Sequence, residues 1–304
     1  MKQVNYIKRT PSGTIFDIVN VSLLVALSFL LLYPFWNQLI ISLNDGLDAQ
    51  RGGLYFWPRV FTLGNCEYIF KTAGMLRALG WSVLRVIVGT STKLFATGML
   101  AYITTVSYFS FHRQLRKMFL ITMYISGGMI PIYLWMIKLH LIETFTVYWL
   151  PSLLGAYEMM IIASYIASLP DAMFESARMD GAKEFKIYLN IVLPLCVPVF
   201  AALGVMVAVG HWNSWFDIMI YNPSGNYDTL QMELRNILIQ SDKVKKLMQD
   251  ATVGSDAVKS AAARITSQSM RAATMMIVTI PIVAVYPFFQ KYFVKGISIG
   301  AVKG

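Results

Sequence analysis

Charged residues are scarce in this 304-residue chain: Asp, Glu, Lys and Arg make up 14% of it, while hydrophobic residues make up 56%. Soluble domains carry roughly 25% charged residues. Apolar runs of about 20 residues, long enough to cross a bilayer, recur along the chain. The spans should be helical, because a helix satisfies its own backbone hydrogen bonds within lipid. The shortage of charge therefore predicts an all-α membrane protein with a single transmembrane domain over residues 1–304.

The residues and motifs that usually carry catalysis are also few. The two cysteines, Cys66 and Cys196, stand in a polar loop and in an apolar run, so no disulfide is expected. The three histidines are isolated, and no Cys/His cluster has the spacing of a metal site. Neither a G-x-x-x-x-G-K-[ST] nucleotide loop nor a G-x-S-x-G nucleophile motif occurs. We therefore expect no catalytic residue, no metal site and no cofactor on this chain, and no enzyme activity of its own.

Acidic residues are outnumbered, with 16 Asp and Glu against 26 Lys and Arg and a formal net charge of +10. Such an excess can indicate nucleic-acid binding. Here, however, the basic residues stand in loops beside the apolar runs, where membrane topology places them. We therefore expect contact with membrane lipid and no nucleic-acid partner.

Six apolar stretches have spanning length, and we predict spans over residues 15–43, 79–106, 118–139, 145–169, 191–210 and 273–293. The basic N-terminal segment leads into a full-length span and lacks a small-residue cleavage site, so it is expected to be retained. Lys and Arg gather at both termini and in the loops after the second and fourth spans. This bias predicts that both termini and the loop at about 170–190 are cytoplasmic. The long loops at about 44–77 and 211–272 would then lie outside the cell.

The second of these outer loops carries a helical pattern. Its apolar residues recur on one helical face, at Leu230, Leu234, Ile237, Val244 and Met248. Asp228 followed by Gln231 resembles a capping box. We therefore predict a surface helix in this loop.

A polar stretch at residues 170–194 interrupts the apolar sequence between the fourth and fifth predicted spans. Residues 171–179 are expected to form a short helix after Pro170, since proline suits the first turn of a helix. Gly181 is expected to take a left-handed conformation that other residues resist. A second helix then runs into the fifth span. Composition alone leaves two interpretations open, an ordinary amphipathic connector and a docking element for a soluble partner.

The residues of this stretch resemble the E-A-A-x(2)-D-G-A-x(8)-I-x-L-P loop of the membrane subunits of bacterial ATP-binding-cassette importers. Ser176 stands where that loop usually has Ala, and Tyr188 stands where Phe is typical. The C-terminal residues 290–304 resemble the sugar-importer branch, specifically the maltose-type second membrane subunit. The residues that match the loop are Glu175, Ala177, Asp180, Gly181, Ala182, Ile191, Leu193 and Pro194.

The resemblance implies a six-span permease subunit in a bacterial cytoplasmic membrane, coupled to an ATPase on a separate chain. It implies four partners: a second homologous permease subunit, two cytoplasmic ATPase subunits that bind ATP and Mg²⁺, and an extracytoplasmic solute-binding protein. The implied cargo is an oligosaccharide, including fragments of acidic polysaccharides. In the docking loop, Glu175 and Ser176 would face the ATPase, Ala177 and Ala182 would allow close contact, and Asp180 and Gly181 would form the turn.

Two groups of residues are candidates for the substrate pathway. Glu158, with Tyr157 beside it, lies within the fourth predicted span, where a lipid-facing carboxylate costs about 2.5–3.5 kcal/mol or more. It should therefore face a wet pathway or make a structural hydrogen bond to a neighbouring helix, and both readings stay open. Trp212, Asn213 and Trp215 follow the fifth span. Their rings and amide suit sugar binding, but Trp also anchors spans at membrane interfaces.

Two other function classes remain open at this stage. An autonomous channel or secondary transporter for small solutes would need no docking partner and would give Glu175 and Gly181 no specific role. A membrane-anchored scaffold would move nothing.

Overall fold

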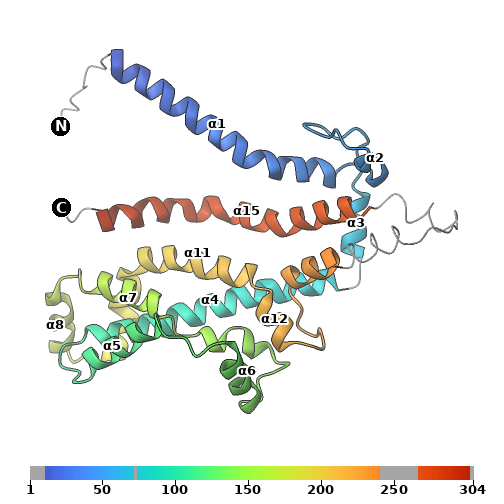
Figure 1. Cartoon of the computed structure of the whole chain (residues 1–304). Coiled ribbons are helices and arrows are strands. Elements are labelled where there is room, and N and C mark those ends of the chain that lie inside the picture. Colours follow the sequence, from blue (N-terminus) through green and yellow to red (C-terminus); the bar gives the residue numbers. More distant parts are fainter. Residues whose placement is uncertain (1–10, 72–73, 240–265, 302–304) are drawn as a thin grey trace. The chain divides into compact units, whose positions relative to one another are not determined.

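The computed structural model describes residues 11–71, 74–239 and 266–301, and within these ranges the regular structure is helical apart from one bridge between Asn44 and Phe61. The prediction of an all-α fold is confirmed. The chain divides into two compact units, one of Met1–Lys71 with Gln240–Ile277 and one of Thr72–Ile239 with Val278–Gly304 (Figure 1). That the whole chain works as one permease domain stays a prediction.

The first unit contains α1 (Pro11–Ser42), α2 (Gly46–Gln50), α3 (Gly64–Lys71) and the beginning of α15 (Ser267–Ala301). The apolar side chains of α1 are largely exposed between residues 15 and 36, which suits a helix surrounded by lipid. Its last turn is buried, where Ile40 and Ile41 pack with Ala49, Leu54 and Ala272.

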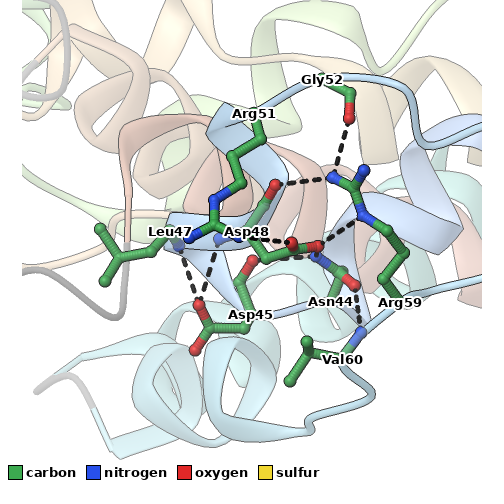
Figure 2. A network of polar contacts seen from close by, with 8 residues as sticks. All are labelled: Asn44, Asp45, Leu47, Asp48, Arg51, Gly52, Arg59 and Val60. Atoms are coloured by element: carbon green, nitrogen blue, oxygen red, sulfur yellow. Dashed lines mark hydrogen bonds and ion pairs between the residues drawn. The ribbon is translucent and has the colours of Figure 1, made fainter.

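The loop between α1 and α3 is held together by a polar network (Figure 2). Asp45 caps α2, because its carboxylate accepts hydrogen bonds from the backbone N–H groups of residues 47 and 48 at 3.0 and 3.3 Å. Arg59 donates to the Asp48 carboxylate at 2.9 Å and to the Gly52 carbonyl at 2.8 Å. Asn44 donates to the same carboxylate at 3.0 Å and, with Arg59, holds the pKa of Asp48 below its ordinary value.

The second unit is built around α4 (Met75–Thr105), which packs along both α7 (Ala156–Ile166) and α11 (Val197–Asn213) (Figure 1). Its core contains side chains from all three helices and from the segment 187–192. Gly98 permits the close approach, since a Cβ atom there would lie 2.6 Å from the Phe200 ring and 2.7 Å from the Tyr188 hydroxyl.

Among the described residues, three helices are long and apolar enough to cross a membrane: α1, α4 and the Ser267–Val285 part of α15. Two bent pairs bring the number to five if each is one span. These are Phe145–Ser152 with Ala156–Ile166, bent by 50°, and Glu184–Leu195 with Val197–Asn213, bent by 80°. The chain is thus a multi-pass helical protein by length and composition, and the count of six stays a prediction.

The predicted third span, residues 118–139, is not one helix, which corrects the sequence-based expectation. It falls into α5 (His112–Thr122) and α6 (Met129–Lys138), with residues 123–128 between them. Gly128 takes the left-handed φ of +82°, and the Ser126 hydroxyl accepts its N–H at 3.2 Å. This run of serine and glycine favours a turn over a helix, which explains the break.

The predicted fourth and fifth spans are also interrupted. The fourth begins with the 3-10 helices η1 (Phe145–Tyr148) and η2 (Leu150–Ser152) before α7. The fifth begins with the π-helical segment η3 (Tyr188–Val192) and α10 (Leu193–Leu195), and it breaks at Cys196 before α11. Pro151, Pro194 and Pro198 fall within these stretches. Proline removes a helical hydrogen bond, so the breaks follow from the sequence.

The predicted surface helix is present over residues 230–239, while Val244 and Met248 lie outside the described residues. Its capping differs from the prediction. Asp228 accepts a hydrogen bond from Asn222 at 2.9 Å, and Gln231 donates to Asn213 at 3.1 Å, so neither forms the expected box. The backbone N–H of Leu230 instead donates to the Ser82 hydroxyl of α4 at 2.8 Å.

Candidate functional site

The loop 170–194 folds as the sequence predicts. Helix α8 (Asp171–Met179) is followed by Gly181 at φ +78° and then by α9 (Glu184–Ile187). The N–H of Gly181 donates to the Arg178 carbonyl at 2.9 Å, and the N–H of Ala182 donates to the Ala177 carbonyl at 3.0 Å. This pair of bonds is a Schellman motif, which closes a helix with a left-handed residue. Gly181 therefore sets the direction in which the chain leaves α8.

One face of α8 packs on the protein and the other is exposed. Phe174 is buried, and its ring centroid lies 6.3 Å from that of Tyr102 on α4. Ala177 and Ala182 pack against the same core, so their small size serves contacts within this chain. The exposed positions of α8 and its closing turn are Asp171, Ala172, Met173, Glu175, Ser176, Met179, Asp180 and Gly181, and Met179 is 88% exposed.

A second set of contacts, which sequence reasoning missed, joins α8 to α9. The Arg178 Nε donates to a carboxylate oxygen of Glu184 at 3.1 Å, and the Tyr102 hydroxyl donates to the other oxygen. Burial is the largest single influence and acts to lower the pKa of Arg178, but the hydrogen bonds and charge interactions with Glu184 and Tyr102 together raise that pKa, so the guanidinium stays charged. The signal available in the sequence was an Arg and a Glu on either side of the Asp-Gly turn.

A cavity of about 580 Å³ lies elsewhere in the same unit, between α4, η1, η2, α7, α11 and α12 (Phe216–Tyr221). Its volume falls within the roughly 300–1,000 Å³ of small-molecule sites. Its lining is rich in groups that can hydrogen-bond. The charged, histidine and tyrosine side chains that line it are Arg85, Lys93, Tyr148, Tyr157, Glu158, His211, Asp217 and Tyr221.

Glu158 is paired with Lys93. The Lys93 Nζ lies 2.7 Å from a Glu158 carboxylate oxygen, and the two side chains are 17% and 15% exposed. Gly155 makes room for this pair, because a Cβ there would lie 1.9 Å from a Glu158 oxygen and 2.9 Å from the Lys93 Cε. Glu158 thus lines a cavity and is ion-paired with α4, and its role in a substrate pathway stays a prediction.

A second ion pair lies on the same cavity. Arg85 is 2% exposed, and its guanidinium donates to both carboxylate oxygens of Asp217, one at 3.3 Å. The Ser214 hydroxyl donates to the same carboxylate at 2.7 Å, and the Tyr148 ring centroid lies 5.1 Å from the guanidinium. Arg85 and Lys93 stand eight residues apart on one apolar helix. Two cations on one helical face within a span were the signal that the sequence offered.

The candidates Trp212, Asn213 and Trp215, at and just after the C-terminal end of α11, do not line this cavity. Trp212 is buried, and its indole N–H donates to the Val278 carbonyl at 3.3 Å. The Asn213 side-chain oxygen accepts a hydrogen bond from Gln231 at 3.1 Å. The Arg235 guanidinium carbon lies over the Trp215 ring, 4.8 Å from its centroid. Of the five predicted pathway residues, Tyr157 and Glu158 are the two that the cavity brings together.

Comparisons with known proteins give a consistent picture. A model of the family described as binding-protein-dependent transport system inner membrane component matches residues 96–299. The chain is 34% identical to Protein LplC of Bacillus subtilis over 305 residues, which cover 100% of both. It is 29% identical over 291 residues to the polygalacturonan/rhamnogalacturonan transport system permease protein YtcP of Bacillus subtilis, covering 95% of this chain and 99% of that protein.

The fold is also found in a solved structure. It is a chain from a bacterial ABC transporter involved in the import of the acidic polysaccharide alginate, and it superposes with a TM-score of 0.82. The match covers 93% of this chain and 98% of that chain at 23% sequence identity.

Proposed function

Because this chain belongs to the family of inner membrane components of binding-protein-dependent transport systems, we propose that it is a permease subunit of an ATP-driven oligosaccharide importer. The observation that carries the proposal is the geometry of the loop 170–194. Its Schellman-closed helix displays Glu175, Asp180 and Gly181 on an exposed surface, where an ATPase subunit can bind them. ATP itself binds to that separate subunit with Mg²⁺.

The remaining partners follow from the same proposal. A second, homologous permease subunit forms the other half of the translocation pathway. A second ATPase subunit pairs with the first to hydrolyse ATP, and an extracytoplasmic solute-binding protein delivers the oligosaccharide. The protein lies in a bacterial cytoplasmic membrane, with both termini and the docking loop in the cytoplasm. The distribution of Lys and Arg over the short loops supports this orientation.

The charged cavity is the proposed part of the pathway in this subunit. Carboxylates, a guanidinium and tyrosine hydroxyls are groups that hydrogen-bond sugar hydroxyls, and the cavity combines all three kinds. Arg85 and Lys93 are paired with Asp217 and Glu158 in the cavity, so a carboxylated sugar would take the place of one of these carboxylates as the partner of a cation. The relative that carries polygalacturonan and the fold neighbour that imports alginate support a cargo that includes acidic oligosaccharides.

Reconstitution tests the proposal. The chain is purified alone and, separately, with its sister permease and ATPase, and both preparations are placed in liposomes that contain ATP. Labelled oligogalacturonide is then added outside with the binding protein. Uptake should require the complete assembly and ATP. Uptake by this chain alone would refute the proposal in favour of an autonomous channel or secondary transporter, and no uptake by any assembly would favour a scaffold.

A further inference from the structure

We propose that Glu184 is a positioning residue that fixes the docking helix α8 to α4, so that movement of α8 is delivered along α4 to the charged cavity. This inference rests on the proposed function, because it assigns the intramolecular route of the coupling. We call the set of Tyr102, Tyr108, Arg178 and Glu184 the Glu184 junction.

The Glu184 junction joins four segments through one carboxylate. Tyr102 near the end of α4 and Arg178 near the end of α8 both donate to Glu184, which begins α9. The Arg178 guanidinium also lies 5.1 Å from the ring centroid of Tyr108, in the connection between α4 and α5. Hydrogen bonds to charged groups are among the strongest in proteins, so this carboxylate has the strength to hold the segments in one arrangement.

Tyr102 is the member that ties the junction to α4. It is 3% exposed, and its ring packs on Phe174 of α8 at 6.3 Å and on Tyr188 of η3 at 6.1 Å between centroids. Its hydroxyl reaches Glu184 from this packed position. If α8 moves, the movement therefore reaches α4 through both the ring contacts and the hydrogen bond of Tyr102.

Two routes lead from the docking loop towards the cavity, and α4 is the stiffer one. The covalent route passes through the π-helical segment η3, the short α10 and an 80° bend before α11. π-bulges and prolines interrupt the hydrogen-bond ladder of a helix and are the points at which helices kink. By contrast, α4 is one helix of 31 residues.

The same helix carries the cations of the cavity. Lys93 lies nine residues before Tyr102 and Arg85 lies seventeen before it. At 1.5 Å per residue these separations correspond to about 14 Å and about 26 Å along the axis. A shift of α4 at the junction thus moves the partners of Glu158 and Asp217 directly.

The first experiment needs only this chain. Tyr102→Phe removes the hydroxyl and keeps the ring contacts, and Glu184→Gln removes the charge and keeps the shape. Amide hydrogen exchange of the full chain in lipid nanodiscs is followed at Gly181 and Ala182, whose N–H groups close α8. Loss of a hydrogen bond to a carboxylate predicts exchange about tenfold faster at both amides. Unchanged exchange in both variants would overturn the proposal.

Tyr165→Phe is the matched control. It also removes one hydroxyl from a part-buried tyrosine, whose bond to the Leu195 carbonyl is 3.4 Å long and lies outside the junction. Exchange at Gly181 and Ala182 should stay at the wild-type rate. An equal rise in this control would show that any lost hydroxyl loosens the fold, which overturns the specific role of Glu184.

The second experiment measures coupling in the complete transporter. Uptake of labelled oligogalacturonide per ATP hydrolysed is compared in wild type, Tyr102→Phe, Glu184→Gln and Tyr165→Phe. The two junction variants should retain their ATPase subunits and lose about tenfold in this ratio. A merely structural role predicts loss of assembly with an unchanged ratio in the complexes that remain. Absence of uptake in wild type would count against the proposed function, while the exchange experiment still judges the junction.

Discussion

Gly155→Ala probes the Lys93–Glu158 pair without removing either charged group. The backbone of Gly155, at φ −108° and ψ 118°, is open to any residue, so the substitution adds no backbone strain. Its Cβ would, however, lie 1.9 Å from a Glu158 carboxylate oxygen and 2.7 Å from the carboxylate carbon. The carboxylate has to withdraw by about 1 Å or more, because such short contacts are strongly repulsive.

This withdrawal has a definite cost. The displaced carboxylate is the end of a flexible side chain that lines a cavity, so the cost comes mainly from the 2.7 Å ion pair with Lys93, which lengthens. Losing a hydrogen-bonded contact between partly buried charged groups costs about 1–3 kcal/mol, and we expect Gly155→Ala to lower the free energy of unfolding by about this amount. Chemical unfolding of the purified chain in detergent measures the change, and oligogalacturonide uptake by the complete transporter should fall with it.

Gly210→Ala is the matched control, since Gly210 lines the same cavity and a Cβ there meets nothing within 4 Å. Alanine favours a helix over glycine by up to about 1 kcal/mol, so the two substitutions should move stability in opposite directions. In a Glu158→Ala background the clashing atoms are gone, and Gly155→Ala should cost no more than about 0.5 kcal/mol. A Gly155→Ala protein as stable as Gly210→Ala would refute the geometry of this site.

Three further substitutions have defined outcomes. Gly98→Ala should lower the free energy of unfolding by about 1–3 kcal/mol, because its Cβ would lie 2.6 Å from a ring of α11; wild-type stability would contradict that packing. Asp217→Asn should cost about 1–3 kcal/mol in the same assay, since it leaves the buried Arg85 without its charged partner, and a smaller cost would mean that the pair contributes little. Hydrogen bonds from Asn44 and Arg59 hold the pKa of Asp48 below its ordinary value in the fold, so its stabilisation is present above the unfolded-state pKa and is lost as the pH falls through the folded-state pKa. The thermal stability difference between wild type and Asp48→Asn should therefore stay constant near neutral pH and shrink once the solution is acidic enough to protonate this carboxylate; a difference independent of pH would contradict this prediction.

The local structure of the docking loop was predictable because its determinants are local. A polar segment between apolar runs must leave the membrane, and Asp180–Gly181 offers the one left-handed position in it. Helix α8 and its closing glycine therefore follow from a few neighbouring residues. The long apolar helices α1 and α4 follow from composition for the same reason.

Features that depend on residues far apart in the chain could not be predicted from the sequence. Arg85 pairs with Asp217, which lies 132 positions away, and Lys93 pairs with Glu158 on another helix. No local sequence pattern therefore indicates either partner. The break between α5 and α6 was missed because the apolar residues on both sides suggest one span. The turn between the two helices depends on Gly128, whose φ of +82° is a conformation that other residues resist.

For Trp212, the sequence predicted the position correctly but left the role of the side chain open. The sequence places aromatic residues after the fifth span, and they are there. Whether an indole meets substrate or protein depends on what packs against it, and Trp212 is buried against the carbonyl of Val278. Glu158 is the converse case, because one carboxylate both lines the cavity and pairs with Lys93.

The most direct test of the account is a comparison of Gly181→Pro with Gly225→Pro in the reconstituted transporter. Both glycines have a left-handed φ, +78° and +73°, and both donate their N–H to the carbonyl three residues earlier, at 2.9 and 3.1 Å. Proline disrupts both turns equally, but only Gly181 lies in the docking loop. We predict that Gly181→Pro lowers uptake per ATP hydrolysed at least about tenfold, while Gly225→Pro keeps the wild-type ratio. Equal ratios in the two variants would contradict it.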